Sequence, residues 1–268
     1  MASLKTASPP AVDRALAILE ELARSNRGLR LPEIAHKLGM PKSSAHSVLV
    51  ALERRGYLQR NDSNGRYLFG TKIFTLANLA LSGTTLRQLA HPILTELMRR
   101  TGLMVHMAIL DRDQAVLIEQ IGPPHLPAPM TWLGKRFDLH CTALGKALAA
   151  WEPETQWDRL IREHTLPRHN DNTICSPKGF LEELARTRQR GYAVDDEEVD
   201  LGVRCLAVPV LSRSNEAVAA ISLSGSTSEI NEGTADSRIR LLAAAAANIG
   251  QTIGAPLASG LEAHISAG

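Results

Sequence analysis

Cysteine and aromatic residues are scarce in this chain. Its three cysteines, Cys141, Cys175 and Cys205, are odd in number and far apart in the sequence. This usage argues against a disulfide framework and indicates a reducing compartment, so we expect a cytoplasmic protein. Aromatic residues make up 4% of the chain and hydrophobic residues 44%, so the cores must consist mainly of alanine, leucine, isoleucine and valine.

Long apolar runs are missing as well. No segment approaches the roughly 18 consecutive apolar residues of a membrane-spanning helix, so the sequence predicts no membrane partner. Residues 1–10 lack the apolar region of a secretory signal and predict only a disordered lead.

A large net charge of either sign is also missing, because the total is +2, but the charges are unevenly placed. Residues 1–83 contain 12 Lys or Arg against 6 Asp or Glu, and the remainder contains 18 against 22. A basic module followed by a mildly acidic one is typical of a nucleic-acid-binding domain fused to a second domain. Ordinary scatter of surface charge explains the imbalance equally well.

Residues 11–70 show the pattern of a winged helix-turn-helix. Apolar residues recur three times at helical spacing, with Asp13 as the expected cap of the first helix. Two short strand-like runs, 57–60 and 66–70, then flank an Asn64-Gly65 turn, which predicts a β-hairpin. A further apolar helix at 71–83 is expected to link this domain to the next.

The third helix is expected to enter the major groove of double-stranded operator DNA. Its apolar stripe packs inward, so the opposite, polar face is the one that reads bases and phosphates. Ser43, His46 and Ser47 lie on that face. Because the N-terminal residues of a recognition helix reach base edges most readily, the candidates are Lys42, Ser43, Ser44, His46 and Ser47. In the wing, Arg60 and Arg66 are expected to contact the DNA backbone or the minor groove. The alternative is a solvated helix face on a protein-docking module.

Residues 84–268 mix helices with strand pairs. Two hairpins are expected, at 103–110 with 115–120 and at 205–211 with 217–224. The expected helices are 85–100, 143–150, 178–190 and 236–253. Hairpins combined with helices predict an α+β domain on an antiparallel sheet.

Several segments, in the same order, resemble the IclR family of bacterial regulators. In the first domain they are 12–19 (VDRALAIL), 31–35 (LPEIA), 56–58 (GYL) and 65–67 (GRY). In the second they are 142–147 (TALGKA), 191–198 (GYAVDDEE) and 202–209 (GVRCLAVP). Two positions depart from the family pattern: Ser47 stands where Arg is common, and Asp138 where Pro is common. The loss of that Arg removes a bidentate contact, so we expect an unusual operator sequence.

The resemblance implies a winged helix-turn-helix joined to a GAF-like sensor domain at 84–268, with a curved antiparallel sheet, helices on both sides and a cupped pocket. It also implies a transcription regulator, repressor or activator, and not an enzyme. Its DNA affinity would be controlled by a small-molecule effector, a small organic or aromatic acid. Because a lone winged helix reads few base pairs, we expect a homo-oligomer, either a dimer or a tetramer.

The resemblance also implies which residues line the effector pocket: Asp195, Cys205, Ser222 and Ser224. The two serines are two apart on an expected strand and so share a face. The segment 141–147 runs into a helix start, where the backbone N–H groups of Ala143 and Leu144 favour a carboxylate. The alternative is that the serines face solvent, the cysteine is a small core residue and the aspartate caps a turn.

Two other functions would use the cysteines of this chain. A thiol enzyme would need Cys141 with a base and an orienting group, for which His106 and Asp195 are the available partners. A zinc site would need Cys141, Cys205 and His140 to converge, but no close pair of ligands has metal-site spacing. We therefore predict no catalytic residues, no metal and no cofactor.

Overall fold

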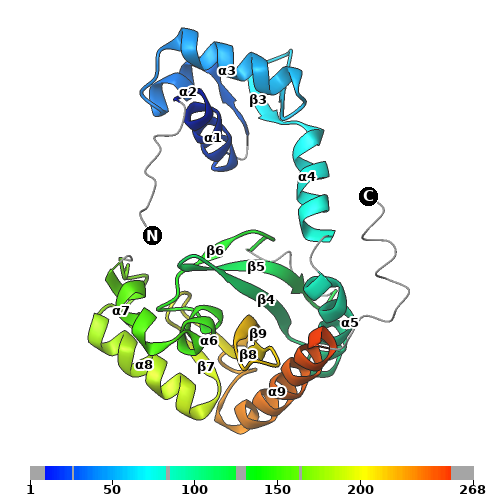
Figure 1. The fold of residues 1–268 in the computed structure, drawn as a ribbon, viewed down its shortest axis with the longest axis vertical. Helices are drawn as coiled ribbons and strands as arrows, with labels where there is room; N and C mark the ends of the chain where they lie inside the picture. Colours follow the sequence, from blue (N-terminus) through cyan, green and yellow to red (C-terminus); the bar gives the residue numbers. More distant parts are fainter. Residues whose placement is uncertain (1–9, 26, 83–84, 125–130, 163–164, 255–268) are drawn as a thin grey trace. The chain divides into compact units, whose positions relative to one another are not determined.

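The computed structural model describes residues 10–25, 27–82, 85–124, 131–162 and 165–254 (Figure 1). The chain divides into two compact units, residues 1–83 and 84–268. Apart from Pro10, the expected disordered lead lies outside the described residues. No helix within the described ranges is long and apolar enough to cross a membrane.

The first unit is a helical module with a small sheet. Its helices are α1 (Pro10–Ala23), α2 (Leu31–Lys37), α3 (Lys42–Arg54) and α4 (Thr71–Ser82). Its strands β1 (Leu29–Arg30), β2 (Leu58–Arg60) and β3 (Arg66–Phe69) form an antiparallel sheet in the order β1-β3-β2. The core contains Ile18, Leu22, Ile34, Leu49, Leu58 and Tyr67. This arrangement confirms the helix-turn-helix followed by a hairpin wing.

Two details of this unit differ from expectation. Helix α1 begins at Pro10, so Asp13 lies in its first turn instead of capping it. Proline is well suited to a helix start because its fixed φ is already helical. Strand β1 was not predicted, because two residues are too few to show an alternating pattern. Gly39 has a φ of +60° between α2 and α3, a conformation that glycine adopts without strain.

The second unit is built on a six-stranded antiparallel sheet. Its helices are α5 (Thr85–Thr101), α6 (Ala143–Trp151), α7 (Glu154–Arg162), α8 (Pro177–Arg190) and α9 (Glu232–Gly254). The strands are β4 (Met104–Asp111), β5 (Gln114–Ile121), β6 (Arg136–Phe137), β7 (Ala193–Asp196), β8 (Val203–Leu211) and β9 (Ala217–Ser226). Their order in the sheet is β6-β5-β4-β9-β8-β7.

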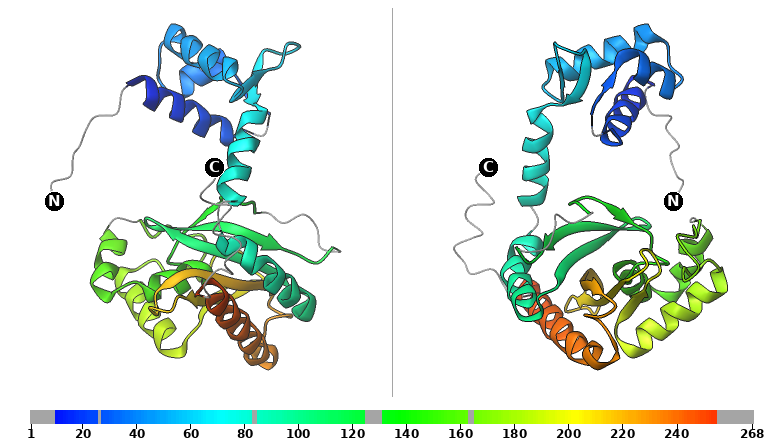
Figure 2. Two further views of the ribbon diagram at one scale, coloured as in Figure 1. Left: turned by 45° about the vertical axis from the view of Figure 1, so that its right-hand side comes forward. Right: turned by 180° about the vertical axis from the view of Figure 1, so that it is seen from behind.

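Helices cover both faces of this sheet (Figure 2). Helices α5 and α9 pack on one face against branched aliphatic side chains. Helix α6 packs on the other, where Ala108, Ala207 and Ala220 are fully buried, and α7 and α8 share the same core beside α6. These small side chains let α6 lie close to the strands. The expected α+β class on an antiparallel sheet is confirmed.

The sequence pattern missed three elements of this unit. Strands β6 and β7 are too short to show a clear alternation. Helix α7 (ETQWDRLIR) buries only Trp157 and Leu160, so its apolar stripe is narrow. Helix α9 also begins at Glu232, ahead of the expected 236.

Candidate DNA-reading face and effector pocket

Helix α3 has a buried face and a polar face. Ala45 and Leu49 are fully buried in the first core, whereas Lys42, Ser43, His46 and Ser47 are exposed and Ser44 is half-buried. No side chain caps the start of α3, which follows Pro41. Backbone N–H groups in an uncapped first turn can bind a phosphate oxygen. The start of α3 therefore combines a lysine, hydroxyls and unpaired amides on one surface.

The two wing arginines differ in their surroundings. Arg60 is exposed, with its guanidinium 5.9 Å from the centre of the Tyr67 ring. Arg66 is half-buried, donates to the carbonyl oxygen of Gly28 (2.7 Å) and pairs with Glu33 (3.3 Å). Arg66 is therefore engaged within the domain, where it holds the wing against α2.

Sequence reasoning missed one exposed cation beside the wing. The Nε of Arg30 donates to the carbonyl oxygen of Asn64 at 3.0 Å, in the wing turn. Because its strand β1 was not predicted, no sequence signal placed Arg30 next to the hairpin.

Strand register brings polar residues together on the α6 face of the larger sheet. Asp195 pairs with Cys205, Cys205 with Ser224, and Ser224 with Met104, across β7, β8, β9 and β4. Ala207, Ser222, His106 and Gln120 form the adjacent row, across β8, β9, β4 and β5. Directly paired residues project to the same side of a sheet. Because Ala207 packs in the core beneath α6, both rows face that helix.

A cavity of about 450 Å³ lies over these rows. Its lining includes all six residues predicted for the effector: Ala143, Leu144, Asp195, Cys205, Ser222 and Ser224. Further lining residues that sequence reasoning did not assign to this site include Met104, His106, Thr131, Lys135, Phe137 and Asp200. They come from β4, from β6 and the segment before it, and from the loop after β7, and no local pattern reveals that these parts converge.

In the first turn of α6, one backbone N–H group is capped by a side chain, and the N–H groups of the two residues before it are not. Thr142 is the N-cap, and its Oγ1 accepts a hydrogen bond from the backbone N–H of Gly145 at 3.1 Å. The N–H groups of Ala143 and Leu144 lie in the first turn, where no intrahelical partner exists. Gly145 is needed for packing, because a Cβ there would lie 2.5 Å from the Cα of Leu139. Ala143 and Leu144 both line the cavity, and their N–H groups have no hydrogen-bond partner among the described residues.

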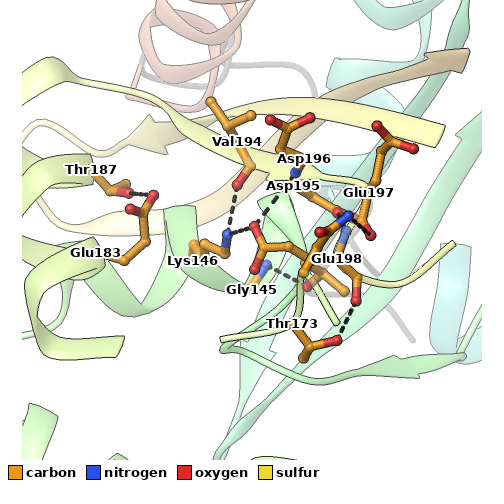
Figure 3. Close-up of polar contacts among 12 residues, drawn as sticks. Gly145, Lys146, Thr173, Glu183, Thr187, Val194, Asp195, Asp196, Glu197 and Glu198 are labelled. Atoms are coloured by element: carbon orange, nitrogen blue, oxygen red, sulfur yellow. Dashed lines mark hydrogen bonds and ion pairs between the residues drawn. The ribbon is translucent and has the colours of Figure 1, made fainter. Parts of the chain in front are cut away.

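A buried ion pair fixes the segment that carries Asp195 (Figure 3). Lys146 is fully buried, pairs with Glu198 and donates to the carbonyl oxygen of Val194 at 2.7 Å. The carboxylate of Asp195 accepts a hydrogen bond from the backbone N–H of Glu198 at 2.9 Å. Burial raises the pKa of Glu198, and the charge of Lys146 opposes that rise. The TALGKA and GYAVDDEE segments thus meet in space, and Lys146 positions the pocket aspartate.

Burial controls the protonation of the pocket residues. It raises the pKa of Asp195 to about 6 and that of Cys205 to about 12. Burial, assisted by the charge of Lys135, lowers the pKa of His106 to about 4, so this imidazole is neutral at pH 7. Burial also raises the pKa of the Cys141 thiol. Because a nucleophilic cysteine must be a thiolate, neither pocket cysteine has the chemistry of a catalytic residue.

The three residues that a zinc site would need, Cys141, Cys205 and His140, do not all converge. His140, Cys141 and His169 place their ligand atoms within 4.8 Å of one another, whereas Cys205 is not in this group. The Nε2 of His140 already contacts the carbonyl oxygen of Pro167, and that of His169 contacts Asp138, both at 3.0 Å. Burial raises the pKa of the Cys141 thiol, which disfavours the thiolate form that a metal ion binds.

Two family profiles cover most of the chain. The IclR helix-turn-helix domain matches residues 11–62, and the bacterial transcriptional regulator IclR C-terminal domain matches residues 78–251. The chain belongs to the IclR family of bacterial transcription regulators. This assignment confirms the resemblance noted in the sequence and the combination of a helix-turn-helix DNA-binding domain with the C-terminal domain of IclR regulators.

Similar proteins of known name agree with the family. The HTH-type transcriptional regulator XynR of Escherichia coli is 37% identical over 82% of this chain and 88% of its own. The IclR of Thermotoga maritima has a TM-score of 0.74 and 30% identity, over 91% of this chain and 98% of its own. An IclR homologue from Microbacterium hydrocarbonoxydans, solved with 4-hydroxybenzoate, shares the fold with a TM-score of 0.77 at 22% identity, covering 90% and 98%. The IclR-family protein described here is thus a DNA-binding transcription regulator and not an enzyme.

Proposed function

We propose that this regulator senses a small carboxylic acid, which binds in the sensor pocket and changes operator affinity. The observation that carries the proposal is the convergence of the six predicted residues, from α6, β7, β8 and β9, on one cavity. A binding site needs such a concave, largely apolar space with a few polar groups that fix the ligand's orientation.

The acid has a defined orientation in this proposal. Its carboxylate accepts hydrogen bonds from the backbone N–H groups of Ala143 and Leu144, where the α6 dipole also favours negative charge. Its polar end lies near Asp195, Cys205, Ser222 and Ser224. The 4-hydroxybenzoate bound by the M. hydrocarbonoxydans homologue supports this class of ligand.

DNA is contacted, in this proposal, by the start of α3 and by the wing. Lys42 and the free amides of the first turn hold phosphate, while Ser43, Ser44, His46 and Ser47 face base edges. Arg60 contacts the backbone beside the wing. Arg66 acts indirectly, because its pairing with Glu33 fixes the wing's position.

Two copies of the chain are needed for this mechanism. Helix α4 leaves Phe74 69% and Leu79 65% exposed, which is a large apolar surface for a helix in a monomer. We propose that α4 pairs with its mate in a symmetric dimer or tetramer. An effector shifts DNA affinity only if it binds one arrangement of the oligomer better than another.

The test measures DNA and effector binding on the same protein. Fluorescence anisotropy with DNA from upstream of the regulator's own gene is titrated in the absence and presence of a panel of carboxylic acids. An acid should change the DNA affinity of the wild type, and the response should weaken roughly tenfold or more in Ser222→Ala with Ser224→Ala. DNA affinity without acid should be unchanged. A full response in the double variant would place the effector elsewhere.

A further inference from the structure

The proposed DNA contacts leave one cation at the wing without a role. Arg30 lies on β1, outside the β2–β3 hairpin, and its side chain is exposed. The Nε of Arg30 donates to the carbonyl oxygen of Asn64, at 3.0 Å, in the turn between β2 and β3. This turn is the part of the hairpin that projects from the first unit (Figure 2, left). The guanidinium of Arg30 is therefore held against the projecting end of the wing.

Two contacts fix the backbone of Arg30 in this position. Arg30 pairs with Arg66 on β3, and its backbone N–H donates to the carboxylate of Glu33 at 2.6 Å. Glu33 in turn forms an ion pair with Arg66. A flexible side chain loses conformational freedom when it binds, and a guanidinium that is already held at one nitrogen loses less. Arg30 is thus presented to a partner in a largely fixed position.

The end of the wing has arginines on both of its faces. Arg66 and Tyr67 are neighbours on β3, so they point to opposite faces of the sheet. Arg30 shares the face of Arg66, with which it pairs. Arg60 shares the face of Tyr67 for the same reason. Within the described ranges of the first unit, neither Arg30 nor Arg60 forms an ion pair. The turn contains one acid, Asp62, so the end of the wing has a net positive charge.

The start of α3 offers few groups that can select a base pair. Lys42 is the one permanent cation among its five candidate residues. A lysine ammonium is a point charge and lacks the planar fork with which arginine binds a base edge. The Oγ of Ser47 donates its proton to the carbonyl oxygen of Ser43, at 3.1 Å, within the helix. We therefore expect the sequence preference of the operator to depend in part on contacts outside α3.

The minor groove next to the α3 half-site matches the chemistry of a guanidinium. When a recognition helix occupies the major groove, a wing beside it faces the adjoining minor groove. In that groove A·T base pairs present only acceptors, whereas G·C pairs add the 2-amino donor of guanine. A guanidinium can only donate. A·T tracts also have a narrow minor groove with a stronger negative potential, which attracts arginine.

We infer that Arg30 enters the minor groove beside the wing and gives the operator a preference for A·T base pairs next to each half-site. This inference rests on the proposed DNA contacts of α3 and the wing, and it adds a specificity-determining residue that lies outside both. If Arg30 instead contacted a phosphate, it would raise the affinity for all sequences alike, because phosphates carry no sequence information. The base dependence of binding therefore separates the two contacts.

The experiment first finds a binding site and then changes only the base pairs next to it. Full-length wild-type protein selects duplexes from a randomised library, and the bound fraction is sequenced. Three versions of an enriched site then carry A·T, G·C or inosine·cytosine pairs next to the half-sites. Inosine lacks the 2-amino group of guanine, so an inosine·cytosine pair combines the minor-groove edge of A·T with the major-groove edge of G·C. Affinities are measured by fluorescence anisotropy at one salt concentration, because DNA affinity depends on salt.

Arg30→Gln separates the charge of the side chain from its hydrogen bond. The amide nitrogen of glutamine can take the place of the arginine Nε and donate to Asn64, whereas the guanidinium is lost. Arg24→Gln, at an exposed position just beyond α1, is the charge-matched control. The thermal midpoints of both variants should lie close to that of the wild type, because both positions are exposed.

The wild type should bind the A·T and inosine·cytosine versions roughly tenfold more tightly than the G·C version. That preference should fall below about threefold in Arg30→Gln and persist in Arg24→Gln. An unchanged preference in Arg30→Gln would mean that Arg30 only supports the wing turn. An equal loss of affinity for all three duplexes would mean that it contacts a phosphate. Either result, or a wild type without the A·T preference, would overturn the inference and leave the proposed function intact. A wild type that enriches no sequence would overturn the proposed DNA contacts as well.

Discussion

The two faces of the larger sheet use alternate residues of the same strands for different purposes. On the α5–α9 side, Val105, Met107 and Ile221 are fully buried in an aliphatic core. On the α6 side, their chain neighbours His106 and Ser222 line the cavity. Because side chains alternate along a strand, stability and binding are separated by a single residue step.

The separation explains how a pocket can exist in a small domain. Buried polar groups and an open cavity both reduce stability, so the aliphatic face must supply the packing that the binding face lacks. On the α6 side, alanines dominate where the helix packs and polar side chains appear where it begins. Substitutions on the aliphatic face should therefore lower stability and spare ligand binding, whereas substitutions on the cavity face should weaken ligand binding and spare stability.

Lys146 is an exception to this division of the two faces, because it is buried on the α6 side and yet should contribute strongly to stability. Lys146→Met should lower the free energy of unfolding by about 3–5 kcal/mol, since it leaves Glu198 buried without its partner. Urea denaturation followed by circular dichroism measures the change. Adding Glu198→Leu should recover at least half of the loss. No recovery would mean that the pair is not the main role of Lys146.

Neighbours on β9 give the direct test of the two faces. Ile221→Ala, on the aliphatic face, should cost about 2–5 kcal/mol of unfolding free energy and leave acid affinity unchanged. Ser222→Ala, one residue away, should change stability by less than about 1 kcal/mol and weaken acid binding. Denaturation and calorimetry on both variants separate the outcomes. Equal effects of both on acid binding would show that the faces are not independent.

Two pocket residues should give opposite pH profiles. Asp195 has a raised pKa of about 6, so the folded state holds its proton longer and stability falls as pH rises from 4 to 6. His106 has a lowered pKa of about 4, so the unfolded state binds the proton first and stability rises as pH rises from 4 to 6.5. The two contributions oppose each other in the wild type.

Single variants should expose each contribution. The compared quantity is the change in unfolding free energy as the pH rises from 4 to 6.5. This change should be about 2 kcal/mol more favourable in Asp195→Asn than in the wild type, because the variant lacks the destabilising titration of Asp195. It should be about 2 kcal/mol less favourable in His106→Gln, because that variant lacks the stabilising titration of His106. Asn keeps the acceptor for the Glu198 amide but does not titrate. Urea midpoints across this pH range measure both slopes, and parallel curves for all three proteins would contradict the assignment.

Local patterns were enough to predict much of this molecule. The α3 stripe and the Asn64-Gly65 turn predicted the winged helix-turn-helix, because both signals lie within a few residues. The serine pair on β9 indicated a shared face for the same reason. The Lys146–Glu198 pair joins residues 52 apart in sequence, and the row of Ser222, His106 and Gln120 depends on strand register. Neither leaves a local pattern, so only the fold reveals them.

Helix α3 repeats the division of faces on a smaller scale and gives the smallest expected effect. Lys42→Ala removes an exposed charge at the first residue of α3, ahead of the buried Ala45 and Leu49. It should leave stability within about 0.5 kcal/mol of the wild type. If Lys42 contacts one phosphate, the slope of log affinity against log salt should become shallower by about 0.9. Arg24→Ala, at an exposed position just beyond α1, is the charge-matched control and should leave the slope unchanged. An equal change of slope in both variants would indicate a general effect of net charge instead of a contact at α3.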